Sequence, residues 1–313
     1  HLMRIRERSR IKPGRAAAER GLAAVAAKLG VSAEDVEELG VPTFGLGVDG
    51  RRVSPCGTGQ LELRLASDGE VSMVYTDPRG KSLRSVPAAA RAASPEVVVQ
   101  FKADVKLLRG VISSSWRRFD RSLRSERSWA AADWRTRILG HPVLGITANG
   151  LIWSVIEADG ACTRQFLLVD GAATDEAGRE VPLPADHERV RLWHPIDSDA
   201  TEVETWRRRV EKAVTQPFRQ AHRETYRPDR SDGKDPDRSR RFGDLVVRHG
   251  LLAGLCKARE WAMAHFIMGS GSGPEWRGRN GQPSARLEVQ PIGTETEPSG
   301  AFSYLVSGNT RFF

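Results

Sequence analysis

The segment 216–226, QPFRQAHRETY, holds the densest group of side chains in this chain that could act together on a substrate. Its candidate residues are Arg219, His222, Arg223, Glu224 and Tyr226. A histidine and a carboxylate could transfer protons, and paired arginines could grip a phosphate. A helix starting after the proline would put Arg219 and Arg223 on one face and His222 on another. The alternative is a surface helix with intrahelical ion pairs and a packed tyrosine.

His194 belongs to the same candidate polar cluster and ends an apolar run in the sequence RLWHP. Pro195 keeps the residue before it out of the α region, so His194 is expected to be extended. Asp199 is expected to cap the next helix, with Glu202 at capping-box spacing. We interpret His194 as a residue that shapes the strand exit. One cleft gathering it with the arginines would indicate an enzyme, and dispersal would indicate a binding module.

Metal and cofactor sites are not predicted. His194, His222, His249 and His265 have no cysteine or carboxylate at ligand spacing, and the three cysteines lie far apart. The glycine-rich loop at 268–281 lacks the lysine of a P-loop and the spacing of a dinucleotide fold, so it is expected to be a flexible connection. The polar segment at 227–241 is expected to be mobile.

A second candidate site is a basic helix face in the sequence SWRRFDRSLRSER. Its residues are Arg117, Arg118, Arg121 and Arg124. Guanidinium groups along one face could follow a nucleic-acid backbone. The alternative is a solvated face, because Asp120 and Glu126 lie close by. The net charge of +8 adds little, because only eight of the 48 basic residues are lysine, a skew expected of a GC-rich genome.

The elements that must position these residues are set by local signals. Ser94 and Pro95 favour a helix start, and apolar residues at steps of three or four predict a helix over about 95–125. Helices are also predicted at 14–29 and after Ser32, and a hairpin around Asp68-Gly69. A helix over 129–139 is followed by a meander of about four strands over 150–193, and strands return near the C-terminus.

The predicted fold is therefore α+β, with N-terminal helices and a β-hairpin, a long central helix, and an antiparallel meander sheet covered by helices. The predicted domains are residues 1–90 and 94–313, which the long helix could join into one continuous core. No apolar run reaches the roughly 20 residues of a membrane helix, and no signal peptide is visible. We expect a cytoplasmic protein that does not contact membranes.

The ordered set of motifs resembles a known family. GQLELRLASDGEVSMVYTDPRGKSLRSVP, RSWAAADWRTRILGHPVL, LPADHERVRLWHP, QPFRQAHRETY and RRFGDLVVRHGLLAGLCKAREW occur in that order. Together they resemble the C-terminal region of the domain-of-unknown-function 4132 family, the MolR-like bacterial proteins. The resemblance implies other domains in a longer parent protein, with no reaction or catalytic residues to carry over. Association of some members with the WGR module implies a nucleic-acid or ADP-ribose context only by analogy.

The function expected from these observations is a non-catalytic interaction or regulatory module of a larger bacterial protein, contacting nucleic acid through the basic helix face. The alternative is an enzyme of unknown reaction on a phosphorylated or nucleotide substrate, using the polar cluster. A scaffold without a ligand is a third interpretation.

Overall fold

The computed structural model describes residues 11–157, 160–225, 238–239, 243–259, 261–262, 273–276, 285–296 and 302–312. The chain divides into two units, His1–Thr225 and Tyr226–Phe313. The helices of the first unit are α2 (Lys12–Leu29), α3 (Ala33–Leu39), α4 (Ala88–Ala93), α5 (Pro95–Arg124), α6 (Ala131–Trp134), the π-helical η1 (Arg135–Leu139), α7 (Leu144–Ala148), the 3-10 turn η2 (Pro195–Asp197) and α8 (Ala200–Ala213). Its strands are β1 (Arg51–Cys56), β2 (Gly59–Leu65), β3 (Val71–Thr76), β4 (Ser82–Leu83), β5 (Ser128–Ala130), β6 (Ile152–Ile156), β7 (Cys162–Val169), β8 (Ala172–Thr174) and β9 (Arg189–Leu192). The α+β prediction is confirmed.

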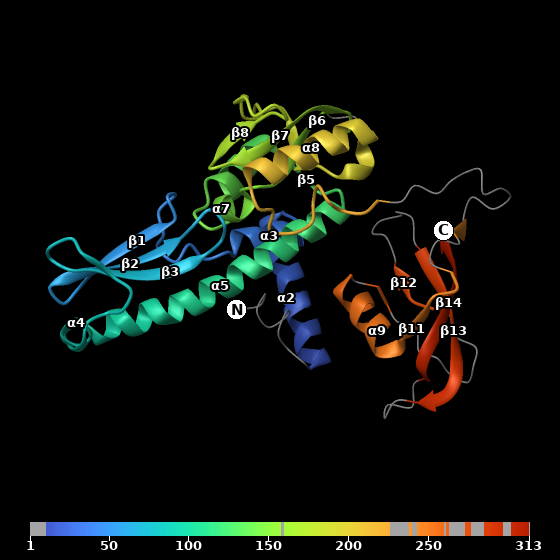
Figure 1. The fold of residues 1–313 in the computed structure, drawn as a ribbon, viewed down its shortest axis with the longest axis horizontal. Helices are drawn as coiled ribbons and strands as arrows, with labels where there is room; N and C mark the ends of the chain where they lie inside the picture. The colour runs from blue at the N-terminus through green and yellow to red at the C-terminus, as the bar shows by residue number, and fades with distance from the viewer. Residues whose placement is uncertain are drawn as a thin grey trace. The chain divides into compact units, whose positions relative to one another are not determined.

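The predicted hairpin around Asp68-Gly69 joins β2 to β3 in an antiparallel sheet of order β1-β2-β3-β4. Leu61, Leu63 and Leu65 alternate along β2 and are buried, as expected for a strand with one covered face. They share a hydrophobic core with Phe101 of α5. Figure 1 shows this sheet lying along one end of α5.

Helix α5 begins and ends close to the predicted bounds of 95–125. Its buried stripe includes Val98, Leu108 and Phe119, as the three- and four-residue spacing predicts. Ser94 occupies the N-cap position, but its hydroxyl accepts a hydrogen bond from the Gly57 amide at 3.0 Å instead of capping the helix. The same core continues from the first sheet along α5 to the second sheet, across position 90.

The second sheet has the antiparallel order β5-β9-β6-β7-β8. The predicted simple meander is wrong in two places, because β9 returns to pair with β6 and the third of its predicted strands, EVPLP at 180–184, is not a strand. Pro182 and Pro184 have no N–H to donate to a ladder, and only Glu180 forms a bridge. Within the predicted helix over 129–139, Trp129 belongs instead to β5.

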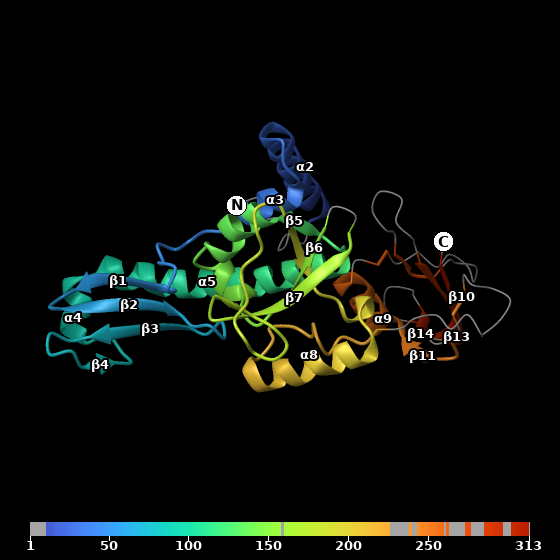
Figure 2. The ribbon, with the colours of Figure 1, turned by 90° about the horizontal axis from the view of Figure 1, so that it is seen from above.

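The two faces of this sheet are both covered, since alternate side chains enter different cores. Trp153 and Phe166 face the core that contains α5, where the ring of Trp153 lies 6.0 Å from that of Phe119. Ile152 and Trp193 face α8 and pack against Trp206. Figures 1 and 2 show α8 along the sheet.

The second unit is a smaller sheet with one helix. Its elements are β10 (Arg238–Ser239), β11 (Val246–Arg248), α9 (His249–Ala258), β12 (Glu275–Trp276), β13 (Ala285–Thr296) and β14 (Phe302–Phe312). The sheet has the order β10-β14-β13-β12, with β11 also paired to β14, and α9 packs on it through Leu252 and Cys256. The predicted C-terminal strands correspond to β13 and β14.

Candidate functional site

The segment after α8 is not the helix that its sequence predicts. Helix α8 ends at Ala213, and residues 214–225 form turns and extended chain. Two glutamine side chains replace the hydrogen bonds that a helix would have provided. Gln216 donates to the Gly150 carbonyl at 2.9 Å and accepts from the Ala221 amide at 3.0 Å. This segment, residues 214–222, is called the glutamine loop below.

Gln220 is fully buried and fixes the glutamine loop to the sheet. Its side-chain oxygen accepts from the Ile152 amide at 2.8 Å, and its nitrogen donates to the carbonyls of Ile152 at 2.7 Å and Trp193 at 2.9 Å. Such bonds to the start of strand β6 outcompete a helix, because they also satisfy buried backbone groups of Ile152 and Trp193. The loop is thereby held in one irregular conformation.

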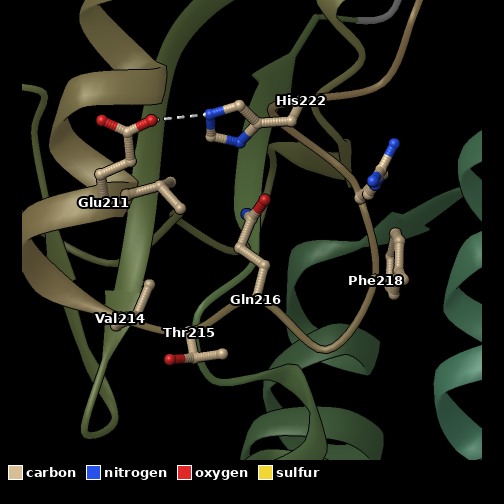
Figure 3. Close-up of a pocket in the computed structure, with 8 residues that line it drawn as sticks. Glu211, Val214, Thr215, Gln216, Phe218 and His222 are labelled. Atoms are coloured by element: carbon tan, nitrogen blue, oxygen red, sulfur yellow. Dashed lines mark hydrogen bonds and ion pairs between the residues drawn. The ribbon is translucent and has the colours of Figure 1, made fainter.

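Arg219 and His222 line a cavity of about 640 Å³ between the glutamine loop and the C-terminal end of α8. The other lining residues are Val210, Glu211, Val214, Thr215, Gln216 and Phe218. His222 Nε2 lies 3.0 Å from a carboxylate oxygen of Glu211, and Figure 3 shows the ring turned toward that carboxylate. The sequence indicated Arg219 and His222, whereas Glu211 becomes their neighbour only through the turn of the chain after α8.

Arg223 and His194 belong to a different group. Arg223 forms an ion pair with Asp120 of α5. His194 Nδ1 accepts a hydrogen bond from the Ile196 amide at 3.1 Å, and its extended backbone agrees with the prediction. Burial lowers the pKa of His194, and the positive charge of Arg223 lowers this pKa further. A neutral imidazole that accepts from a backbone amide has the structural role predicted for His194.

The predicted polar cluster is therefore not brought together in one cleft. Arg219 and His222 line the cavity, while Arg223 and His194 do not. Glu224 is exposed, and Tyr226 lies outside the described residues. Among the residues that the structure describes, no group of three or more histidine, cysteine, aspartate or glutamate side chains could hold a metal ion. The loop at 268–281 and the segment at 227–241 lie mostly outside the described residues.

The predicted arginines of α5 are largely engaged by acids. Arg118 is buried 3.7 Å from Glu37 of α3, and Arg121 lies 2.8 Å from the same carboxylate. Arg124 is 3.5 Å from Asp120. Arg117 alone of the predicted four is exposed, and it too has a polar partner. This part of α5 binds α3 and Arg223, which follows the glutamine loop, so it does not form the continuous basic surface that was predicted.

An exposed basic surface runs from Arg117 toward the N-terminal end of the same helix. Lys102, Lys106, Arg109 and Arg117 are exposed, at relative positions i, i+4, i+7 and i+15. At about 100° per residue these positions fall on one side of an α-helix. We call these four residues the α5 basic stripe. The spacing of these basic residues is visible in the sequence, but the arginines further along are more densely grouped and give the stronger local pattern.

The comparisons with known proteins agree with the sequence resemblance. A model of the family described as domain of unknown function (DUF4132) matches residues 80–261. The chain belongs to the DUF4132 family. The Escherichia coli K12 protein described as "Uncharacterized protein YehI" is 27% identical over 232 residues. That alignment covers 72% of this chain and 19% of YehI, and no solved structure matches.

The DUF4132 match covers both candidate sites. It includes α5 with its basic stripe, α8 and the glutamine loop, whereas α3 and strands β1, β2 and β3 precede it. The acids of α3 that engage α5 therefore come from outside the matched region. In the described parts of this DUF4132 chain, no helix is both long and apolar enough to cross a membrane.

Proposed function

We propose that this DUF4132 chain is a non-catalytic interaction or regulatory module of a longer bacterial protein, and that it contacts nucleic acid through the α5 basic stripe. The observation that carries the proposal is the exposure of Lys102, Lys106, Arg109 and Arg117 along one side of α5. Between Glu96 and Asp120 the helix has one carboxylate, Asp104, and it is buried. The stripe therefore has no acid of its own helix exposed along its length.

The dimensions of the stripe suit a phosphate backbone. Fifteen residues separate Lys102 from Arg117, which is about 22 Å at 1.5 Å per residue. Duplex DNA carries about one charge per 1.7 Å of axis, so several phosphates lie within that length. Among the described residues, Lys102 and Lys106 have no carboxylate within ion-pair distance. Their charges are therefore available to replace condensed counterions.

The arrangement of the polar cluster argues for a module rather than for an enzyme. A catalytic group would need its acid, base and anion-binding residues around one bound substrate. Here Arg223 is ion-paired with Asp120, and His194 accepts a backbone hydrogen bond outside the cavity that Arg219 and His222 line. The enzyme alternative would need a separate constellation of residues.

The test is binding of the protein to fluorescein-labelled duplex DNA and single-stranded RNA at low salt, followed by anisotropy. The variant Lys102→Glu with Lys106→Glu reverses two stripe charges four residues apart. Arg208→Glu with Lys212→Glu is the matched control, because these residues are also exposed and four apart, on α8. Both variants change the net charge equally.

We expect the stripe variant to weaken binding by at least about tenfold and the α8 control by less than about threefold. Equal losses in the two variants would mean that only net charge matters. No binding by the wild type at low salt would refute the nucleic-acid contact outright.

A further inference from the structure

The glutamine loop is an irregular segment with an unusually complete set of anchors. The side chains of Gln216 and Gln220 bond to each other at 3.1 Å and to backbone groups of Gly150, Ile152, Trp193 and Ala221. Every polar atom of the two amides is satisfied by these contacts. Buried amides that are fully bonded hold one conformation and reduce the entropy lost when a ligand binds.

The anchored loop closes one side of the 640 Å³ cavity described above, a volume within the usual range for small-molecule sites. Val210, Val214 and Phe218 give the cavity apolar walls. Glu211 and His222 form a polar pair at 3.0 Å, and Arg219 completes the lining. The site therefore combines apolar surface with a few polar groups, as organic ligands require.

Arg219 differs from the arginines of the paired part of α5. It is exposed, and among the described residues no carboxylate lies within ion-pair distance of it. Arg118 and Arg121, in contrast, share Glu37. A guanidinium group presents a planar fork of donors that matches a carboxylate or a phosphate. At a cavity wall, this fork selects a negatively charged group.

His222 adds a second donor whose ring is oriented by Glu211. His222 Nε2 lies 3.0 Å from a carboxylate oxygen of Glu211, and in the imidazolium form, where both ring nitrogens are donors, Nε2–H donates to Glu211 while Nδ1–H can donate to an anion. A carboxylate that orients a histidine fixes the direction of its other nitrogen.

We propose that this cavity binds a small organic oxyanion, a carboxylate or a phosphate monoester attached to an apolar group. Arg219 binds the oxyanion with help from His222, and Val210, Val214 and Phe218 contact the apolar group. The cavity is lined by the glutamine loop and α8 and by no residue of the α5 basic stripe, so its test does not depend on the nucleic-acid proposal.

The probes are phenyl phosphate and phenylacetate, with inorganic phosphate and phenol to separate the charged from the apolar contribution. Calorimetry measures the affinity of the complete chain, and the histidine ring signals in NMR spectra locate the site. The variants are Arg219→Ala and His222→Ala, and Arg208→Ala is the matched control on α8. Circular dichroism confirms that each variant keeps the fold.

We expect at least one of the two aromatic anions to bind more tightly than inorganic phosphate or phenol and to shift the His222 signals. Loss of a charged hydrogen bond should make Arg219→Ala weaken this binding about tenfold or more. His222→Ala should weaken it about threefold, with Arg208→Ala unchanged.

The preference between phenyl phosphate and phenylacetate identifies the oxyanion. Binding that survives in Arg219→Ala would place the site elsewhere and overturn the proposal. The absence of binding of either anion to the wild type up to about 10 mM, a weak affinity even for a fragment, would also overturn it.

Discussion

The two ends of α5 carry similar numbers of basic residues and use them differently. Toward the N-terminal end, Lys102, Lys106 and Arg109 are exposed, and the helix has no exposed acid between Glu96 and Asp120. Toward the C-terminal end, Arg118 and Arg121 meet Glu37. The difference comes from α3. Its acids contact α5 at Arg118 and Arg121, whereas Lys102, Lys106 and Arg109 remain exposed.

At the C-terminal end of α5, buried charges are paired with charges of opposite sign. Glu37 and Glu38 of α3 are both buried, and each has a guanidinium within ion-pair distance. Glu38 also accepts from the Trp129 indole N–H at 3.1 Å. Burial raises the pKa of Glu38, while the charge of Arg127 opposes this rise. A dense group of arginines in the sequence is therefore weak evidence for a binding surface, because acids of a neighbouring helix can pair with them.

The strongest way to break this comparison is to remove the acid that α3 supplies. Glu37→Gln removes the buried carboxylate that Arg118 and Arg121 share, so we expect a loss of about 3 kcal/mol in the free energy of unfolding. Urea denaturation measures this loss. A change smaller than about 0.5 kcal/mol would show that the pair contributes only as a surface pair does.

A second prediction concerns Asp104, the buried acid in the N-terminal half of α5. Asp104 lies 2.7 Å from Arg52, and its other oxygen accepts from Gln100 at 2.9 Å. Asp104→Asn keeps the shape but removes the charge, so we expect about 2 kcal/mol of destabilisation, with nucleic-acid affinity unchanged. Chemical denaturation and anisotropy together check both parts. Tighter binding by this variant at matched folding would mean that Asp104 opposes the stripe.

The stability of the protein should also depend on pH through His194, whose neighbour Arg223 pairs with Asp120 of α5. The lowered pKa of His194 means that, below the ordinary value of 6.5, the unfolded chain binds more protons than the folded chain. The stability that the neutral ring contributes is complete above that value and is lost as pH falls through the folded pKa. His194→Asn keeps an acceptor for the Ile196 amide without titrating.

Urea unfolding at about pH 7.5 and about pH 5.5 tests this linkage. We expect the wild type to lose more stability between the two than His194→Asn does. An equal loss in both proteins would remove His194 from the account.

The smallest effect is expected at the stripe itself. Lys106→Ala removes an exposed charge that has no ion pair among the described residues, so the free energy of unfolding should change by less than about 0.5 kcal/mol. Thermal unfolding of this variant beside Glu37→Gln gives the sharpest contrast between the two ends. A loss above about 1 kcal/mol would show that the lysine has a structural role.

The parts of the fold that the sequence predicted correctly depend on local signals. Ser32 caps α3 through the Asp35 amide, and Asp199 caps α8 through the amides of Thr201 and Glu202, whereas the full capping box forms at Ser32 and Asp35 and not at Asp199 and Glu202, where it was predicted. These contacts join residues two or three positions apart, so the residue types and spacing suffice to predict them. The apolar stripe of α5 is local in the same sense.

The candidate site was less predictable because its contacts are distant in sequence. Gln220 reaches Ile152 across 68 residues, and Arg121 reaches Glu37 across 84. No local pattern indicates that a glutamine will bond to the backbone at the start of a distant strand instead of continuing a helix. The polar cluster was predicted as one group, but the fold places Arg219 at the cavity and pairs Arg223 with Asp120.

The most direct test of the proposed division of labour along α5 is the salt dependence of nucleic-acid affinity. Each phosphate contact contributes about 0.9 to the slope of log affinity against log salt for duplex DNA. Lys102→Ala with Lys106→Ala should therefore reduce the slope by about 1.8, while Arg208→Ala with Lys212→Ala should leave it nearly unchanged. An unchanged slope in the stripe variant, or an equal reduction in the α8 control, would contradict the assignment of nucleic-acid contact to the exposed end of α5.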